Sequence, residues 1–276
     1  YEVTLSQGTT SIEAPVMFSA AQKRDSNPHA DTSWAAFAFE DSVTVTIRRP
    51  SGHVTSARVL PTHRGIVPHV SSDGTVSFTL NKPGQFAIEL DGQLEAHPLL
   101  VFADPPEQNI PDRNNPDVRW FDPGLHNLGP EIQLVSAGEI LYFAPGSLVY
   151  GRFKGTDADN VRICGRGILA GTIYPPNPPD TYPVPPLFEL SGTSHNTRVE
   201  GITFLDSPHY NLLLRGDRCT VQNIKMIGWW YGTDGVGVGA NSLVENSFFK
   251  VNDDTFKLYR DDMVVRDCTI WQMENG

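Results

Sequence analysis

Three aspartates near the end of the sequence are of the residue type that acid–base chemistry requires. A lone acid, Asp234, precedes an adjacent pair, Asp253 and Asp254, by about twenty residues, and Lys257 follows the pair. A carboxyl group that keeps its proton beside others that are ionised can protonate a leaving oxygen while its neighbours activate a water molecule. The combination predicts a site that cleaves glycosidic bonds. The plain alternative is that each acid belongs to a polar turn.

A short apolar pattern recurs around these acids. Its valines are Val199, Val221, Val244 and Val265, which lie 22, 23 and 21 residues apart. A period in the low twenties, with alternating apolar residues, is typical of a solenoid built from turns of β-strand. Two earlier turns fit the repeat more loosely. Leu141 stands 22 residues before Ile163, but a proline-rich loop, Tyr174–Pro186, is inserted between Ile163 and Val199. Unrelated strands of a sandwich would have no reason to keep this repeat.

The repeat predicts that the acids converge. Asp254 lies ten residues after Val244, whereas Asp234 lies thirteen after Val221, and a bulge at 229–231 would absorb the excess of three. Neighbouring turns are ~4.8 Å apart, so Asp234 is expected directly beside the pair. At least one of the three carboxyl groups should then keep its proton to higher pH than usual.

Aromatic and basic residues near the acids are the candidates for substrate binding, because sugars stack on aromatic faces. These candidates are Trp229, Trp230, Tyr231 and Tyr259, His209 and Tyr210 from the preceding turn, and Lys257 beside the pair. No metal-ligand spacing occurs, so neither a metal nor another cofactor is predicted. The three cysteines, Cys164, Cys219 and Cys268, are expected to be buried free thiols, although a disulfide stays open.

The motifs GTDG, NDDTFKLY and LYFAPGSLVYG, together with the gap of about twenty residues, resemble the dextranase and isopullulanase group, glycoside hydrolase family 49. Polygalacturonases are more distant relatives. The resemblance covers roughly Trp120 to the end. It implies a right-handed parallel β-helix preceded by a β-sandwich. It further implies that Asp253 is the general acid, that Asp234 and Asp254 hold the attacking water, and that the anomeric carbon is inverted.

The substrate class follows from what is absent. The GHG and RIK tripeptides of polygalacturonases do not occur, and a polyanion would have to approach a chain of formal charge −11. A neutral glucan such as dextran or pullulan, cut at α-glucosidic and foremost α-1,6 linkages, fits better. The alternatives are a polygalacturonase-like hydrolase of another polysaccharide, a polysaccharide lyase, and a glycan-binding β-helix without catalysis.

Composition bounds the rest. The 276 residues include 24 glycines and 22 prolines without long helical periodicity, which indicates an all-β chain. The 32 acidic residues against 21 basic ones argue against a nucleic-acid partner, and no apolar run could span a membrane. We expect a β-sandwich of eight strands over residues 1–104, a linker over 105–129 and the β-helix over 130–276. A secreted protein is expected, with further turns, or a second chain, completing the cleft beyond a truncated C-terminus.

Overall fold

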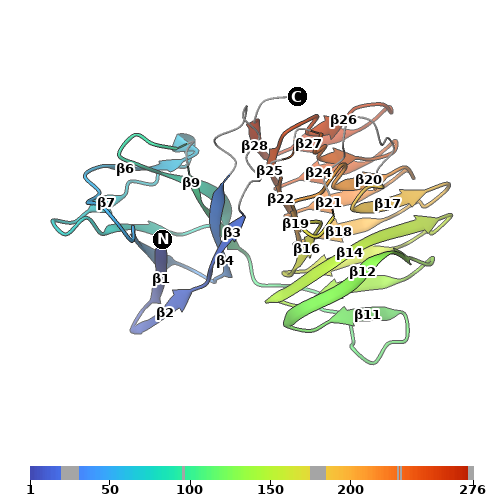
Figure 1. Ribbon diagram of the computed structural model, residues 1–276, viewed down its shortest axis with the longest axis horizontal. Coiled ribbons are helices and arrows are strands. Elements are labelled where there is room, and N and C mark those ends of the chain that lie inside the picture. The colour runs from blue at the N-terminus through green and yellow to red at the C-terminus, as the bar shows by residue number, and fades with distance from the viewer. Residues whose placement is uncertain (20–30, 95–96, 175–184, 229, 231, 273–276) are drawn as a thin grey trace. The chain divides into compact units, whose positions relative to one another are not determined.

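The computed structural model describes residues 1–19, 31–94, 97–174, 185–228, 230 and 232–272. The chain divides into two compact units, Tyr1–Glu107 and Gln108–Gly276. Strands dominate both units (Figure 1), and the helix within the described residues is the single 3₁₀ turn η1, Thr62–Arg64. None of the described helical structure is long and apolar enough to cross a membrane.

The first unit consists of two five-stranded sheets that share one hydrophobic core. The first sheet runs in the order β2 (Thr10–Ala14), β1 (Glu2–Gln7), β5 (Val43–Arg48), β8 (Val76–Leu80) and β7 (His69–Val70). The second runs β3 (Val16–Ser19), β4 (Thr32–Ala38), β10 (Leu99–Asp104), β9 (Gly84–Leu90) and β6 (Ala57–Leu60). Alternate residues of both sheets point into the core, as the period of two in their sequences predicts.

The described residues of the first unit form ten strands, where the sequence predicted eight. The two additional strands, β2 and β7, lack a clear apolar alternation because they are edge strands and mostly exposed. Aromatic residues contribute to the interior of this unit: Phe39 lies in the core, Phe37 packs against it, and Trp34 is buried.

The second unit is a parallel β-helix of about six turns (Figure 1), as the repeat predicted. Three ladders of parallel strands run along it. The first ladder holds β11 (Val118–Phe121), β13 (Ile140–Phe143), β15 (Arg162–Gly165), β18 (Arg198–Glu200), β21 (Thr220–Gln222), β24 (Leu243–Glu245) and β27 (Val264–Arg266). The long strand β14 (Ser147–Thr156) pairs with β12 (Gly124–Leu134) and starts both other ladders.

The second ladder continues from the first half of β14 through β16 (Ile168–Ala170), β19 (Thr203–Leu205), β22 (Lys225–Ile227), β25 (Phe248–Val251) and β28 (Thr269–Gln272). The third continues from its second half through β17 (Phe188–Ser191), β20 (Leu212–Leu214), β23 (Val236–Gly237) and β26 (Phe256–Lys257). Inward residues of all three ladders form one core. This stacking of turn on turn supplies the burial that no single turn could achieve.

The register of the first ladder confirms the repeat. Leu141 pairs with Ile163 and Ile163 with Val199, and the valines at 199, 221, 244 and 265 continue the same line. At the next corner, Asn223, Asn246 and Asp267 have φ values of 52°, 49° and 54°. Asn and Asp tolerate this left-handed conformation better than other side chains do. Their shared position in the repeat therefore reflects one turn shape used three times.

The prediction of a linker over residues 105–129 is wrong for the second half of that segment. Strand β11 and the start of β12 lie there, and both pair with the following turn. Strand β12 escaped prediction because it is an edge strand, mostly exposed, and contains Pro130 where its register with β14 is interrupted. Proline is tolerated at edges and bulges, where no ladder hydrogen bond is lost.

Candidate active site

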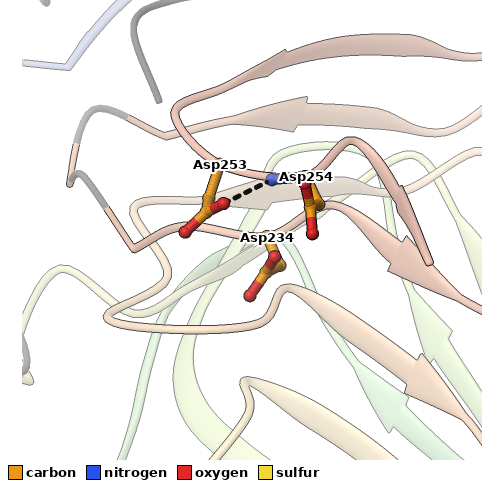
Figure 2. A group of neighbouring side chains, drawn as sticks. All are labelled: Asp234, Asp253 and Asp254. Atoms are coloured by element: carbon orange, nitrogen blue, oxygen red, sulfur yellow. Dashed lines mark hydrogen bonds between the residues drawn. The ribbon is translucent and has the colours of Figure 1, made fainter. Parts of the chain in front are cut away.

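The three aspartates lie at the ends of two consecutive turns (Figure 2). Asp234 comes just before β23, and Asp253 and Asp254 come just before β26. Backbone bonds join these turns: the N–H of Asp253 donates to the carbonyl of Thr233 at 3.2 Å, and the N–H of Gly235 donates to the carbonyl of Asp254 at 3.0 Å. One oxygen of each carboxylate lies within 4.8 Å of the other two. Pairing between neighbouring turns thus brings the acids together.

Lys257 bridges two of the three acids. Its Nζ lies 2.7 Å from Oδ1 of Asp234 and 2.5 Å from Oδ2 of Asp254. Asp253 is outside this bridge, and its Oδ1 accepts a hydrogen bond of 2.8 Å from the backbone N–H of Asp254. The cluster therefore consists of a lysine-linked carboxylate pair and a third, half-buried carboxyl group.

Burial distinguishes the acids further. Asp234 is only 4% exposed, whereas Asp254 is exposed. Burial raises the pKa of Asp234 to about 6, although Lys257 pulls it downward and the charges of Asp253 and Asp254 push it further up. Burial alone would lower the pKa of Lys257, but its hydrogen bonds to Asp234 and Asp254 outweigh that effect and raise it. Lys257 is consequently a permanent cation.

Three converging carboxylates are also a possible ligand set for a divalent cation. Here the ammonium of Lys257 lies within 2.7 Å of two of them and holds the position that such an ion would need. An ion could bind both carboxylates only after displacing that ammonium. The donor set therefore suits the lysine better than a metal.

The preceding turn adds an aromatic contact. The ring of Tyr210 lies 5.3 Å from Nζ of Lys257, close enough for a cation–π interaction. His209, 7% exposed, packs edge-on against Tyr210 with ring centroids 4.5 Å apart. Both predicted candidates thus lie beside the cluster, and Tyr210 contacts its lysine directly.

The remaining aromatic candidates are not among the residues described above as contacting the acids or Lys257. Trp230 is half-buried, and its carbonyl accepts a hydrogen bond of 3.0 Å from the backbone N–H of Thr233. Trp229 and Tyr231 lie outside the described residues. Tyr259 is 70% exposed, two residues beyond Lys257.

Asn211 supports the site and was missed in the sequence. It is fully buried, and both its backbone N–H and its Nδ2 donate to the carbonyl of Asp234, at 3.0 and 2.7 Å. These bonds fix the backbone that carries the buried acid. The available signal was a buried amide one turn before the acid, but sequence does not reveal where that amide points.

The comparisons with known proteins match the chain to two kinds of enzyme. It is 28% identical to a dextranase of Arthrobacter sp. (strain CB-8) over 64% of this chain and 31% of that one. It is 28% identical to a dextranase of Talaromyces minioluteus over 76% and 35%, and 24% identical to an isopullulanase of Aspergillus niger over 87% and 52%. The chain thus spans between about a third and a half of the curated relatives it matches. No family model matches it.

The fold comparison agrees. The solved structure of Dex49A from Penicillium minioluteum superposes with a TM-score of 0.75 at 17% identity, covering 98% of this chain and 65% of that one. The likeness therefore extends over both units of the present chain. Sequence and fold together confirm the resemblance predicted from the acid-bearing motifs: the chain is a homologue of the dextranases and isopullulanases of glycoside hydrolase family 49.

Proposed function

We propose that this chain carries the catalytic acids of a glycoside hydrolase that cleaves a neutral glucan, with α-1,6 linkages as the first candidates. The observation that carries the proposal is the unequal environment of the three acids. Lys257 links Asp234 and Asp254, while Asp253 is outside the bridge and partly accessible. When neighbouring carboxyl groups lie in different environments, one can act as the catalytic acid while another acts as the base.

In this mechanism Asp253 donates its proton to the glycosidic oxygen. Its Oδ1 is held by the backbone of Asp254, which leaves Oδ2 for the proton. Asp234 and Asp254, joined through the ammonium of Lys257, orient a water molecule, and one of them takes a proton from it as the oxygen attacks the anomeric carbon. Breaking the old bond and forming the new one on opposite faces gives inversion.

Inversion is the part of the proposal that most needs a direct test. One oxygen of each carboxylate lies within 4.8 Å of one oxygen of the other two, whereas inverting enzymes commonly have whole carboxyl groups about 6.5–9.5 Å apart and retaining enzymes about 5–5.5 Å. We nevertheless favour inversion, because a lysine that draws two carboxylates together creates a place for water rather than a free nucleophile. The resemblance to family 49 supports the same choice.

The substrate and the location are proposed on the same grounds. The matched relatives are named dextranase and isopullulanase, and the chain's net charge of −11 favours an uncharged polymer over a polyanion. The polymer would be met outside the cell, so we propose a secreted protein.

The test is release of reducing sugar from dextran, pullulan and polygalacturonate, with the product anomer followed by NMR. We expect release from a neutral glucan, and the inverted anomer first. Asp253→Asn should abolish turnover and leave glucan binding intact. Binding without turnover in the wild type would instead indicate a glycan-binding protein, and the retained anomer would overturn the role given to the lysine-linked pair.

A further inference from the structure

A pocket of about 610 Å³ lies beside strand β8 of the first unit. It exists because the edge strand next to β8 is short: β7, His69–Val70, pairs only with the first two residues of β8. Pro68, the residue before β7, has no backbone N–H with which to continue the ladder. Over Phe78–Leu80, none of the described strands therefore pairs with this edge of β8.

The open edge presents backbone hydrogen-bonding groups to the pocket. The N–H of Ser71 donates to the carbonyl of Thr75 at 2.9 Å, which makes these two residues a hydrogen-bonded pair. Such pairs recur at every second residue of an antiparallel ladder, so the N–H and C=O of Thr79 face the open edge. Val67, which would have to pair with Thr79 to satisfy them, is instead 85% exposed. A ligand in the pocket therefore meets one backbone donor and one acceptor.

Short polar side chains from the outer face of the sheet also line the pocket. Thr44 and Thr79 oppose each other on β5 and β8, and their Oγ1 atoms lie 3.3 Å apart. Ser77 lies two residues before Thr79 and so on the same face, and Asn81 follows directly after β8. Hydroxyl and amide groups both donate and accept hydrogen bonds, as the hydroxyl groups of a sugar require.

The ionisable side chains that line the pocket are all basic: Arg64, His69 and Lys82. Within the described residues, neither Arg64 nor Lys82 forms an ion pair, whereas the other arginines described in this unit each pair with a carboxylate. Those paired arginines are Arg48, Arg49 and Arg58. A guanidinium group binds a carboxylate through two parallel hydrogen bonds. The lining therefore suits an anion, and a carboxylate in particular.

The net charge of −11 on the whole chain does not oppose such binding. Charges separated by more than about 8 Å are largely screened at physiological ionic strength, so the basic side chains of the pocket set the field that a ligand meets there. The volume is also sufficient for a sugar. The roughly 13 heavy atoms of a hexuronate, at about 30 Å³ each or less, need less space than the pocket of about 610 Å³ provides.

We propose that this pocket binds an acidic saccharide, that is, a sugar unit that carries a carboxylate. Arg64 and Lys82 bind the carboxylate, and Thr44 and Thr79 bind hydroxyl groups of the ring. The first unit then anchors the chain to an acidic polysaccharide and takes no part in cleavage. This ligand class differs from the neutral glucan of the proposed function, and the inference does not depend on that function.

Calorimetry with the whole chain tests the ligand class. The probes are trigalacturonate, its methyl ester, which has the same rings without the charges, and citrate, which has carboxylates without a ring. We expect trigalacturonate to bind about tenfold or more tightly than either of the others, in line with the loss of one charge-assisted hydrogen bond. Equal affinity for the ester would overturn the role of the carboxylate, and equal affinity for citrate would overturn the role of the sugar.

Variants at exposed positions locate the binding. Arg64→Gln and Lys82→Gln should each weaken trigalacturonate binding about tenfold. Arg48→Gln is the matched control, because Arg48 belongs to the same unit, has a side chain that is 61% exposed and does not line the pocket. Thr79→Trp suits a β-strand and fills the pocket without changing its charge, so it should also weaken binding. Unchanged affinity in Thr79→Trp, or an equal loss in Arg48→Gln, would overturn the assignment to this pocket.

Two measurements separate this inference from the proposed function. Arg64→Gln should hydrolyse a neutral glucan as the wild type does, and Asp253→Asn should bind trigalacturonate with wild-type affinity. If no glucan is hydrolysed and trigalacturonate binding still depends on Arg64, the pocket stands and the hydrolase proposal fails. If a glucan is hydrolysed and trigalacturonate does not bind, the pocket alone is refuted. Loss of trigalacturonate binding in Asp253→Asn would also refute it, because the ligand would then lie at the acids.

Discussion

The buried acid Asp234 makes a quantitative prediction about stability. A pKa that moves from 3.8 to about 6 on folding corresponds to about 3 kcal/mol. The folded protein holds this proton more tightly than the unfolded chain does, so protonation favours the folded state. The free energy of unfolding should therefore fall as the pH rises from about 4 to 6 and change little above that range.

The perturbation that isolates this effect is Asp234→Asn, which removes the titrating group and keeps the shape. Urea unfolding of both proteins is followed at intervals between pH 4 and pH 8. We expect the wild type to lose up to about 3 kcal/mol relative to the variant over this range, with most of the change below pH 6.5. The comparison cancels the contributions of groups that both proteins share.

Two curves that stay parallel would refute the reasoning, because they would mean that burial of Asp234 carries no electrostatic cost. If the wild type instead gained stability relative to the variant as the pH rose, the attraction of Lys257 would outweigh the effect of burial, and folding would favour the ionised form of Asp234. Lys257→Met in the wild-type background supplies the internal check. Without the lysine the pKa of Asp234 should rise further, and the pH-dependent region should move upward.

Three further outcomes are expected. Lys257→Met should lower kcat and shift the acidic limb of the pH–rate profile to higher pH, since the ammonium lowers the pKa of Asp234; an unshifted limb would contradict this. Asn211→Ala should reduce the free energy of unfolding by about 0.5–1.5 kcal/mol, because it removes the side-chain hydrogen bond to the carbonyl of Asp234 and keeps the backbone one; this is measurable by urea titration, and wild-type stability would disprove it. Gly239→Ala should cost about 1–3 kcal/mol of unfolding free energy, because its Cβ meets the Gly216 backbone at 2.2 Å; an unchanged Tm would argue otherwise.

The β-helix could be predicted because the evidence for it is the regular spacing of residues along the sequence. Inward valines at a fixed interval can lie in register only if each turn stacks on the last, and the structure confirms that line from Leu141 to Val265. The same counting brought Asp234 next to Asp253 and Asp254. Position along a regular backbone is thus recoverable from spacing alone.

Other features depend on side-chain direction or on exposure, which spacing does not encode. Lys257 was expected beside the pair, but that it would link Asp234 with Asp254 and leave Asp253 out depends on its rotamer. Asn211 belongs to the same class. Strand β12 was missed for the opposite reason: at an exposed edge, polar residues and Pro130 cost little and erase the apolar alternation.

The backbone bonds between the two acid-bearing turns have a consequence for how the sequence can vary. The acids meet because the carbonyl of Thr233 and the N–H of Gly235 pair with the Asp253–Asp254 segment, so their alignment depends on the length of chain between them. Substitutions in that interval change packing and leave the alignment in place. A residue gained or lost there would move one carboxylate along its strand by about 3.3 Å unless a bulge took up the difference. In this part of the molecule, length is under tighter constraint than residue identity.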